Sequence, residues 1–212
     1  MINKKTNDNI ILEVKKGDYM KKYSIPSKKL INIDELKKIG ISNYLINKKI
    51  KNNELQRLNN KWFDNLNSND VLEDYSYIKV YFQDGVVCLF SAALIHGLTT
   101  YIPEKLQIAI ERDKKSLELP LWPKFEVKYY DKKSFDIGRE KIDLGGEKIS
   151  IYDKERTIIE LLKKRNKYGL EEVKEVFKSY LNSDFKDLNK LYNYAVNFKC
   201  LTTLKLYMEV LL

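Results

Sequence analysis

Two short amphipathic segments, a tight turn between them and a hairpin after them most constrain the fold of the first third of the chain. Asn32–Ile39 predicts a helix, because Asn32 can accept a hydrogen bond from the first turn and Gly40 ends the segment. Ser42–Lys51 predicts a second helix, in which Ser42 is a good N-cap and apolar residues recur at helical spacing. The two helices are therefore expected to be neighbours joined by a very short connection.

A basic hairpin is predicted directly after the second helix. Leu55–Leu58 and Trp62–Phe63 flank the polar stretch Asn59–Lys61, which is typical of a hairpin tip. Helix, tight turn, helix and hairpin form the outline of a winged helix-turn-helix. The first helix of such a domain is expected upstream, around Asn7–Val14, and the whole domain is expected to span residues 1–66.

Positive charge is concentrated in this same region. Residues 1–66 hold 15 Lys or Arg against 7 Asp or Glu, whereas residues 67–212 hold 24 against 23. Nearly all of the chain's net charge of +9 therefore lies in the first third. Such an asymmetry indicates a polyanionic partner, because cations that neutralise phosphates release condensed counterions and so drive binding. Double-stranded DNA is the expected partner, and a membrane surface is not, since no basic amphipathic helix with a clear apolar face occurs there.

In a helix-turn-helix the second helix faces base edges in the major groove, and the wing approaches the backbone or minor groove. Asn can bond adenine with both atoms of its amide, and Lys suits phosphate or guanine. An alternative is a winged-helix fold that is used only for protein contacts. The candidate DNA-binding residues are Ser42, Asn43, Tyr44, Asn47, Lys48, Lys49, Lys51, Arg57 and Lys61.

The rest of the chain predicts a second domain of a different kind, over residues 75–212. Leu66–Asp74 is rich in Asn, Ser and Asp and predicts a linker. Strands followed by a run of helices indicate an α+β domain that ends in a helical bundle. The predicted strands are Tyr77–Phe82, Leu106–Ile110, Phe125–Tyr130 and Lys148–Ile151, and the predicted helices are Val86–His96, Asp153–Lys164, Leu170–Leu181, Phe185–Phe198 and Leu201–Leu212.

Targeting signals and cysteine usage point to the cytoplasm. The longest apolar run, Val86–Leu98, is shorter than the roughly 18 to 20 residues that a membrane span needs. Residues 1–9 are polar and lack the apolar core of a signal peptide. Cys88 and Cys200 both lie in apolar sequence, and we expect two buried free thiols in a reducing compartment.

Residues with catalytic potential are few, and we expect neither an enzyme nor a bound metal or cofactor. His96 is the only histidine and is expected to lie in the core or at a helix end. Glu126 and Lys128 on a predicted strand, with Asp84 and Asp113 upstream, could position water around Mg²⁺ for phosphodiester cleavage. Acid-x-Lys is common in so charged a chain, and a solvated strand face is the favoured interpretation.

The order of segments resembles the AbiEi-type antitoxin family of type IV toxin–antitoxin systems. Glu35–Ser42 and Asn53–Leu58 resemble the N-terminal winged helix of that family. Phe90–Leu98 is similar to its Ser-x-x-Ala-x-x-x-His-Gly-Leu segment, with Ile102-Pro103 following as expected. Ile149–Leu162 is similar to its strand and Arg-Thr-x-x-Asp-Leu helix. The chain departs from the family pattern where Asn60 and Phe63 replace a Gly and a Tyr of the wing and Glu160 replaces an Asp.

The resemblance implies an antitoxin and a DNA-binding transcriptional repressor of its own promoter, in an abortive-infection operon that defends against phage. It further implies that residues 75–212 counteract a nucleotidyltransferase toxin without forming a stable complex with it. Two alternatives are kept open. One is a Mg²⁺-dependent nuclease centred on Glu126 and Lys128 with the winged helix as its targeting module, and the other is a transcription regulator with a small-ligand sensor domain.

Overall fold

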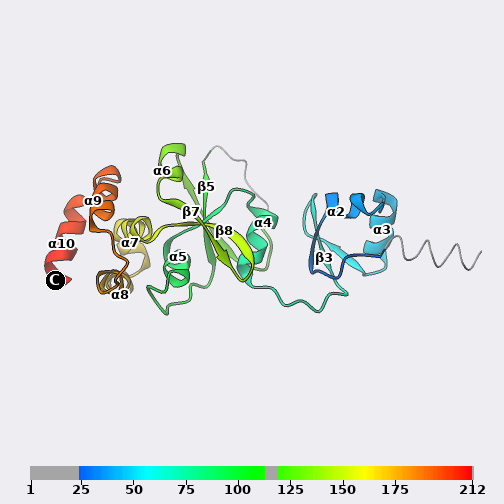
Figure 1. Cartoon of the computed structure of the whole chain (residues 1–212), viewed down its shortest axis with the longest axis horizontal. Coiled ribbons are helices and arrows are strands. Elements are labelled where there is room, and N and C mark those ends of the chain that lie inside the picture. The colour runs from blue at the N-terminus through cyan, green and yellow to red at the C-terminus, as the bar shows by residue number, and fades with distance from the viewer. Residues whose placement is uncertain (1–23, 113–118, 212) are drawn as a thin grey trace, which may run out of the picture. The chain divides into compact units, whose positions relative to one another are not determined.

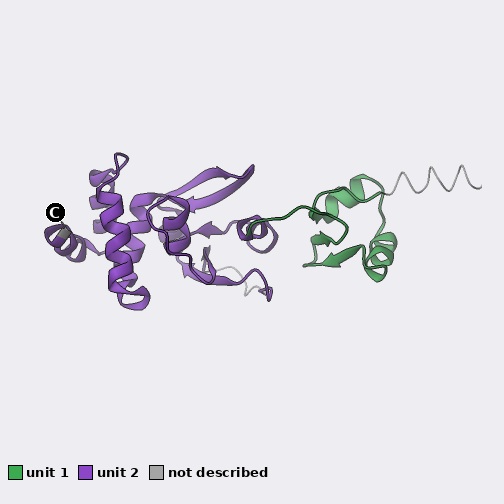
Figure 2. Cartoon of the chain, turned by 90° about the horizontal axis from the view of Figure 1, so that it is seen from below, with its two compact units in different colours: residues 1–73 green, residues 74–212 purple. Residues whose placement is uncertain are grey.

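The computed structural model describes residues 24–112 and 119–211 of the 212-residue chain. The chain forms two compact units, residues 1–73 and residues 74–212 (Figure 2). The helix predicted at Asn7–Val14 lies outside the described residues, and so does Asp113.

Within residues 24–73, the first unit combines two short helices with a small antiparallel sheet whose strand order is β1-β3-β2 (Figure 1). Its elements are β1 (Leu30–Asn32), α2 (Ile33–Lys38), α3 (Asn43–Lys51), β2 (Leu55–Arg57) and β3 (Trp62–Asn65). Each element contributes to one apolar core, which consists of Ile31, Leu36, Ile41, Ile46, Leu55 and Phe63.

The local signals that predicted the two helices are confirmed. The Asn32 side chain accepts a hydrogen bond of 2.9 Å from the backbone of Asp34, and the Ser42 hydroxyl accepts one from Leu45. Asn53 adopts a φ of 55° just after α3 and lets the chain turn into β2. The hairpin is also confirmed. Strand β1 was not predicted, because its three residues are held by pairing with β3 and carry no local signal of their own.

The second unit contains a mixed five-stranded sheet of order β6-β5-β4-β8-β7. The pairs β5–β6 and β4–β8 are parallel, and the other two are antiparallel. Its strands are β4 (Val86–Val87), β5 (Leu106–Glu111), β6 (Phe125–Tyr130), β7 (Arg139–Leu144) and β8 (Glu147–Tyr152).

Helices of this unit pack on the sheet and on one another, and α7 is the central one (Figure 1). It contacts α5 as well as α8, α9 and α10, and it contributes to the largest apolar core. The unit therefore has the α+β character expected from the sequence. Its helices are η1 (Asp74–Tyr77, a 3₁₀ turn), α4 (Ile78–Tyr81), α5 (Leu89–Ile95), α6 (Lys132–Asp136), α7 (Lys154–Tyr168), α8 (Leu170–Leu181), α9 (Leu188–Asn197) and α10 (Leu201–Leu211).

The predicted strand at Tyr77–Phe82 is wrong. This stretch is η1 followed by α4, and the backbone N–H of Phe82 donates to the carbonyl of Ile78 at 2.7 Å. Its aromatic and β-branched residues suit a strand, and the alternation of buried Ile78, Val80 and Phe82 with exposed Lys79 is what a half-buried strand would also show, so this pattern does not separate the two structures.

The predicted helix at Val86–His96 is correct only in its second half. Val86 and Val87 form the central strand β4, and the helix begins at Leu89, whose φ is 53°. Strand β7 and helix α6 were not predicted. Strand β7 exposes most of both faces, so it lacks the apolar alternation that marks a strand in sequence.

None of the helices among the described residues combines the length and the apolar character that a membrane span requires.

Gly138 is the glycine whose replacement is expected to disturb the second unit most. Its φ is +75°, and a Cβ there would meet the Cβ of Arg156 at 2.6 Å. We expect Gly138→Ala to lower the free energy of unfolding by about 1–2 kcal/mol for the left-handed backbone and by about 1–3 kcal/mol more for the clash. Denaturant unfolding of the full chain measures the loss.

Gly146→Ala is the matched control, because Gly146 has a φ of +83° and nothing within 4 Å of its added Cβ. It should show the backbone cost alone. Equal losses for the two variants would mean that the close packing of Gly138 against Arg156 adds nothing to stability.

Candidate nucleic-acid interface

One face of α3 is exposed, polar and basic. Ile46 is buried in the core of the first unit, and Leu45 and Ile50 are partly buried beside it. Because successive residues of a helix are separated by about 100°, the opposite face is a single strip along the helix. The residues of this strip, called here the α3 outer face, are Asn43, Tyr44, Asn47, Lys48 and Lys51, and all five are exposed.

The first turn of α3 is suited to an anionic partner. It contains no acidic residue, so no carboxylate offsets the positive end of the helix dipole. Ser42 is occupied as the N-cap and positions the helix rather than extending along its outer face. Tyr44 is 75% exposed, an unusual position for an aromatic ring without a partner, and it can contact a sugar, a base or a backbone.

Lys49 differs from the other lysines of α3. Its ammonium lies 2.8 Å from the Glu54 carboxylate, and its side chain is only 18% exposed. The hydrogen bond from Lys49 is the largest influence on Glu54 and lowers the pKa of that carboxyl. Lys49 thus lies on the inner side of α3 and fixes the start of β2, away from the α3 outer face.

The hairpin places two further cations on the surface. The Asn59 side chain accepts hydrogen bonds from the backbone N–H groups of Lys61 and Trp62, at 2.8 and 3.0 Å, and so shapes the tip. Arg57 is exposed and its guanidinium lies 5.1 Å from the centre of the Phe63 ring. Because β2 contacts α3, helix and hairpin belong to one packed module.

Three acids of this module pair with lysines that lie off the α3 outer face, and Glu54 with Lys49 is one of these pairs. Glu35 pairs with Lys28 at 2.6 Å, and Asp64 pairs with Lys29 at 3.1 Å. Within residues 24–73, Lys48, Lys51, Arg57 and Lys61 take part in no ion pair. The positive charge on α3 and the hairpin is therefore not cancelled by ion pairs within residues 24–73.

Glu126 and Lys128, the pair on which the nuclease alternative depends, form a half-buried network against α7. The prediction of a solvated strand face is wrong here, since the Lys128 and Glu126 side chains are 12% and 25% exposed. The Glu126 carboxylate accepts hydrogen bonds from Lys128, from Gln107 at 2.7 Å and from Lys167 at 3.0 Å. Tyr168 donates to the same carboxylate at 3.3 Å.

This network leaves Glu126 ionised and fully engaged. Burial raises the pKa of its carboxyl, but the hydrogen bonds from Lys128, Gln107 and Lys167 outweigh burial and lower the pKa to about 2. Burial also lowers the pKa of Lys128, although the Glu126 hydrogen bond opposes this. Residues 24–112 and 119–211 contain no group of three His, Cys, Asp or Glu side chains placed to hold a metal ion. Asp113, an acid that the nuclease alternative invokes, lies outside these residues.

The remaining residues with nucleophilic or basic side chains have structural surroundings. His96 ends α5, and its Nε2 lies 2.7 Å from the carbonyl of Tyr152, as a helix-end histidine is expected to do. Cys88 and Cys200 are both buried and free, as expected of the two thiols themselves. Burial raises the pKa of the Cys88 thiol, so this group is a poor nucleophile.

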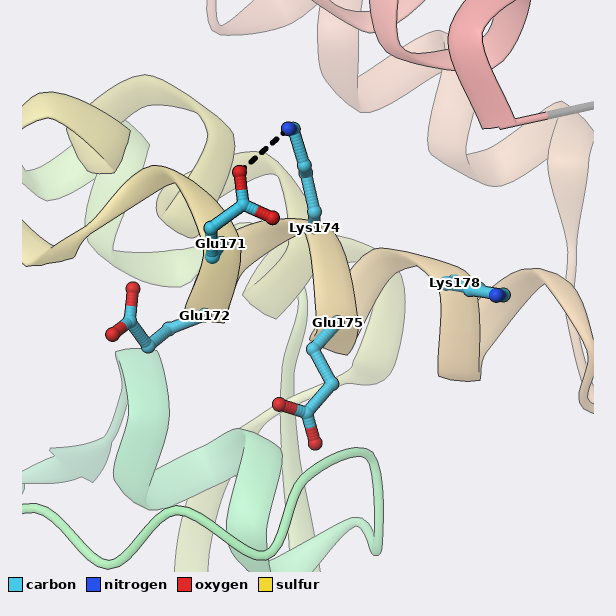
Figure 3. A pocket seen from close by; sticks show the side chains of 5 residues that line it. All are labelled: Glu171, Glu172, Lys174, Glu175 and Lys178. Atoms are coloured by element: carbon cyan, nitrogen blue, oxygen red, sulfur yellow. Dashed lines mark hydrogen bonds and ion pairs between the residues drawn. The ribbon is translucent and has the colours of Figure 1, made fainter.

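A shallow depression on α8 has charges of both signs (Figure 3). Its side chains all come from this one helix, and Lys174 pairs with Glu171 at 2.7 Å. Charges of both signs on a single exposed helix face are typical of a solvated surface. The lining residues are Glu171, Glu172, Lys174, Glu175 and Lys178.

Comparison of the sequence with protein-family models found no matching family, and comparison with curated proteins found no matching protein.

The Glu126 network makes a prediction about acid stability. The folded-state pKa of about 2 lies below the usual ~4.3 of an unfolded Glu, so this group stabilises the fold above that value and the contribution is lost as the pH falls toward 2. We expect Glu126→Gln to flatten the dependence of unfolding free energy on pH between about pH 5 and 3. Urea unfolding at several pH values measures this slope.

Glu140→Gln is the control, because Glu140 is exposed on β7 and no ion pair among the described residues involves it. Its slope should equal that of the unaltered chain. If Glu126→Gln had the same slope as well, the network would contribute nothing to acid stability.

Proposed function

We propose that the first unit is a winged helix-turn-helix domain that binds double-stranded DNA, and that the chain is a transcriptional regulator. The observation that carries this proposal is the α3 outer face, a continuous exposed strip of amides and unpaired lysines beside a basic hairpin. Helix α2, the turn at Gly40 and helix α3 correspond in order to a helix-turn-helix, and β2 and β3 correspond to its wing.

The chemistry of the strip matches the major groove of DNA. Asn43 and Asn47 are one helical turn apart, so both amides can face base edges, where Asn pairs with adenine. Lys48 and Lys51 flank them and suit phosphate or guanine. Arg57 and Lys61 on the hairpin suit backbone phosphates. Lys49, bound to Glu54, is expected to act through the position of the helix rather than through DNA.

The specific biological role that we propose is that of an antitoxin which represses its own promoter and counteracts a nucleotidyltransferase toxin. Support for this role comes from the resemblance to AbiEi-type antitoxins, which extends over both units. Its two segments in the second unit, Phe90–Leu98 and Ile149–Leu162, contain most of α5 and most of α7, and these helices pack against each other. A role in phage defence follows from the same resemblance.

The DNA-binding half is tested with Lys48→Glu combined with Arg57→Glu. The substitutions replace two phosphate contacts by repulsion, so they should weaken affinity for the protein's own upstream DNA by about 100-fold. They should also reduce the slope of log affinity against log salt concentration by about 2. A mobility-shift titration at several salt concentrations measures both quantities. Lys105→Glu with Lys133→Glu, two exposed positions in the second unit, changes the net charge equally and should leave binding intact. Equal loss in both double variants would point to non-specific charge attraction.

Base recognition is tested separately with Asn47→Ala. The loss of a bidentate amide should cost about 1–3 kcal/mol on the specific site and little on random DNA. Competition between the two DNAs measures the ratio of the affinity for the specific site to the affinity for random DNA. An unchanged ratio would mean that the α3 outer face contacts the backbone alone.

The antitoxin role is tested by expressing the chain together with the nucleotidyltransferase that this role requires to be encoded beside it. We expect the full chain to restore growth, and Lys48→Glu with Arg57→Glu to restore growth as well when expression no longer depends on the promoter. Failure of rescue by a chain that still binds its promoter would reject the antitoxin role and leave the DNA-binding proposal standing.

A further inference from the structure

Two neighbouring helices of the second unit expose rows of apolar side chains. Helices α9 and α10 lie side by side and contact each other (Figure 1). Leu188, Tyr192 and Val196 follow one another at four-residue intervals on α9, so they form one exposed row. Leu206 and Val210 are also four residues apart, and they are 57% and 67% exposed on α10. Neither the DNA-binding proposal nor the resemblance makes use of this surface.

A groove lies between the two helices beside these rows. Its volume is about 320 Å³, and most of the side chains that line it are apolar. Exposed apolar surface that is gathered in one place is typical of an interaction site, because covering it removes apolar area from water. The lining residues are Leu188, Leu191 and Tyr192 from α9 and Leu204, Lys205, Met208 and Glu209 from α10.

The charges of α10 are arranged to pair with a second copy of the same helix. Lys205 and Glu209 are exposed and one helical turn apart, and no ion pair within residues 24–112 and 119–211 involves either. When two copies of α10 lie antiparallel about a two-fold axis at the level of Tyr207, Lys205 of each copy faces Glu209 of the other. The same axis brings Leu206 of each copy near Val210 of the other. One arrangement therefore pairs both charges and covers both apolar side chains.

The charge balance of the second unit favours a second copy over a strongly charged partner. Residues 67–212 hold 24 Lys or Arg against 23 Asp or Glu, so two copies of this unit do not repel each other through their net charge. The lining of the groove contains one cation and one anion, which offers no excess charge to a nucleic acid or to an acidic protein. A self-complementary patch of this kind is what a two-fold contact requires.

We propose that two copies of the chain associate through α10, antiparallel about a two-fold axis, and that the second copy covers the groove between α9 and α10. Leu206 and Val210 form the apolar part of the contact. Lys205 and Glu209 pair across it on the flank beside the groove. This contact does not depend on the proposed function.

The test is sedimentation equilibrium of the full chain at concentrations from about 5 to about 500 μM. The unaltered chain should show a monomer–dimer equilibrium with a Kd on the order of 10 μM, in the range of weak interfaces. Lys205→Glu sets two carboxylates of one copy against two of the other and should raise the Kd about tenfold. Lys178→Glu, at an exposed position of α8, is the matched control, because it changes the net charge equally and should leave the Kd unchanged.

A charge swap separates pairing from other effects of the substitution. Lys205→Glu combined with Glu209→Lys restores opposite charges across the axis and should return the Kd to within about threefold of the original value. An equimolar mixture of the Lys205→Glu chain and the Glu209→Lys chain should associate more tightly than either chain alone. A Kd that the swap does not restore would overturn the proposed pairing.

The apolar part of the contact is tested with Leu206→Gln combined with Val210→Gln. Both positions are exposed, so the fold should persist and the chain should remain monomeric at the highest concentration. An unaltered chain that is monomeric throughout the concentration range would overturn the proposal and leave the groove to a different protein. A dimer whose Kd neither Lys205→Glu nor the Gln variant changes would overturn it as well, because association would then use another surface.

Discussion

The hydrogen bond that the buried Glu160 carboxylate accepts from the start of α5 is the interaction on which the second unit depends. Helix α5 starts after Cys88, which offers no side-chain cap, so the first N–H groups of this buried helix need acceptors from elsewhere. Glu160 of α7 accepts from Leu89, and Gln107 of β5 accepts from Phe90 at 2.8 Å. Strand β5 and helix α7 thus supply the acceptors that the first N–H groups of α5 need. These N–H groups are hydrogen-bonded only when all three elements are assembled.

Polar bonds of the same kind join the C-terminal helices to α7. Asp153 caps α7 through Arg156 N at 2.7 Å and also accepts from Tyr194 of α9. Glu155, buried in the first turn, accepts from Tyr180 of α8 at 2.8 Å. Lys190 lies 3.1 Å from Asp153 and 3.3 Å from Glu155 and offsets both charges. The charged start of α7 is therefore tolerated in the core because each carboxylate has partners on the helices that cover it.

Features set by neighbouring residues were predictable from the sequence, and features set by distant partners were not. Asn32 and Ser42 form caps with N–H groups two and three residues away, so both helix starts could be inferred. Strand β4 exists because Val87 pairs with Ile108 on one side and Ile151 on the other, and a two-residue strand has no periodicity to detect.

The same distinction separates the candidate sites. Helical spacing alone indicated which side chains of α3 face outward, apart from Lys49, whose partner Glu54 lies beyond the helix end. The Glu126 pair seemed solvated because Lys167 and Tyr168, which cover it, are distant in sequence.

The parallel pairing of β4 with β8 also bears on how the chain is synthesised. All the strand pairs described in the first unit can form once the chain has been synthesised as far as Asn65. The central strand of the second unit, β4, can pair with its second neighbour, β8, only after Ile151 has been added. A ribosome therefore completes the basic module long before the larger sheet can close. A nascent chain that stalls between these points carries its basic module together with an open strand edge, the kind of edge that recruits other chains into aggregates and that chaperones protect.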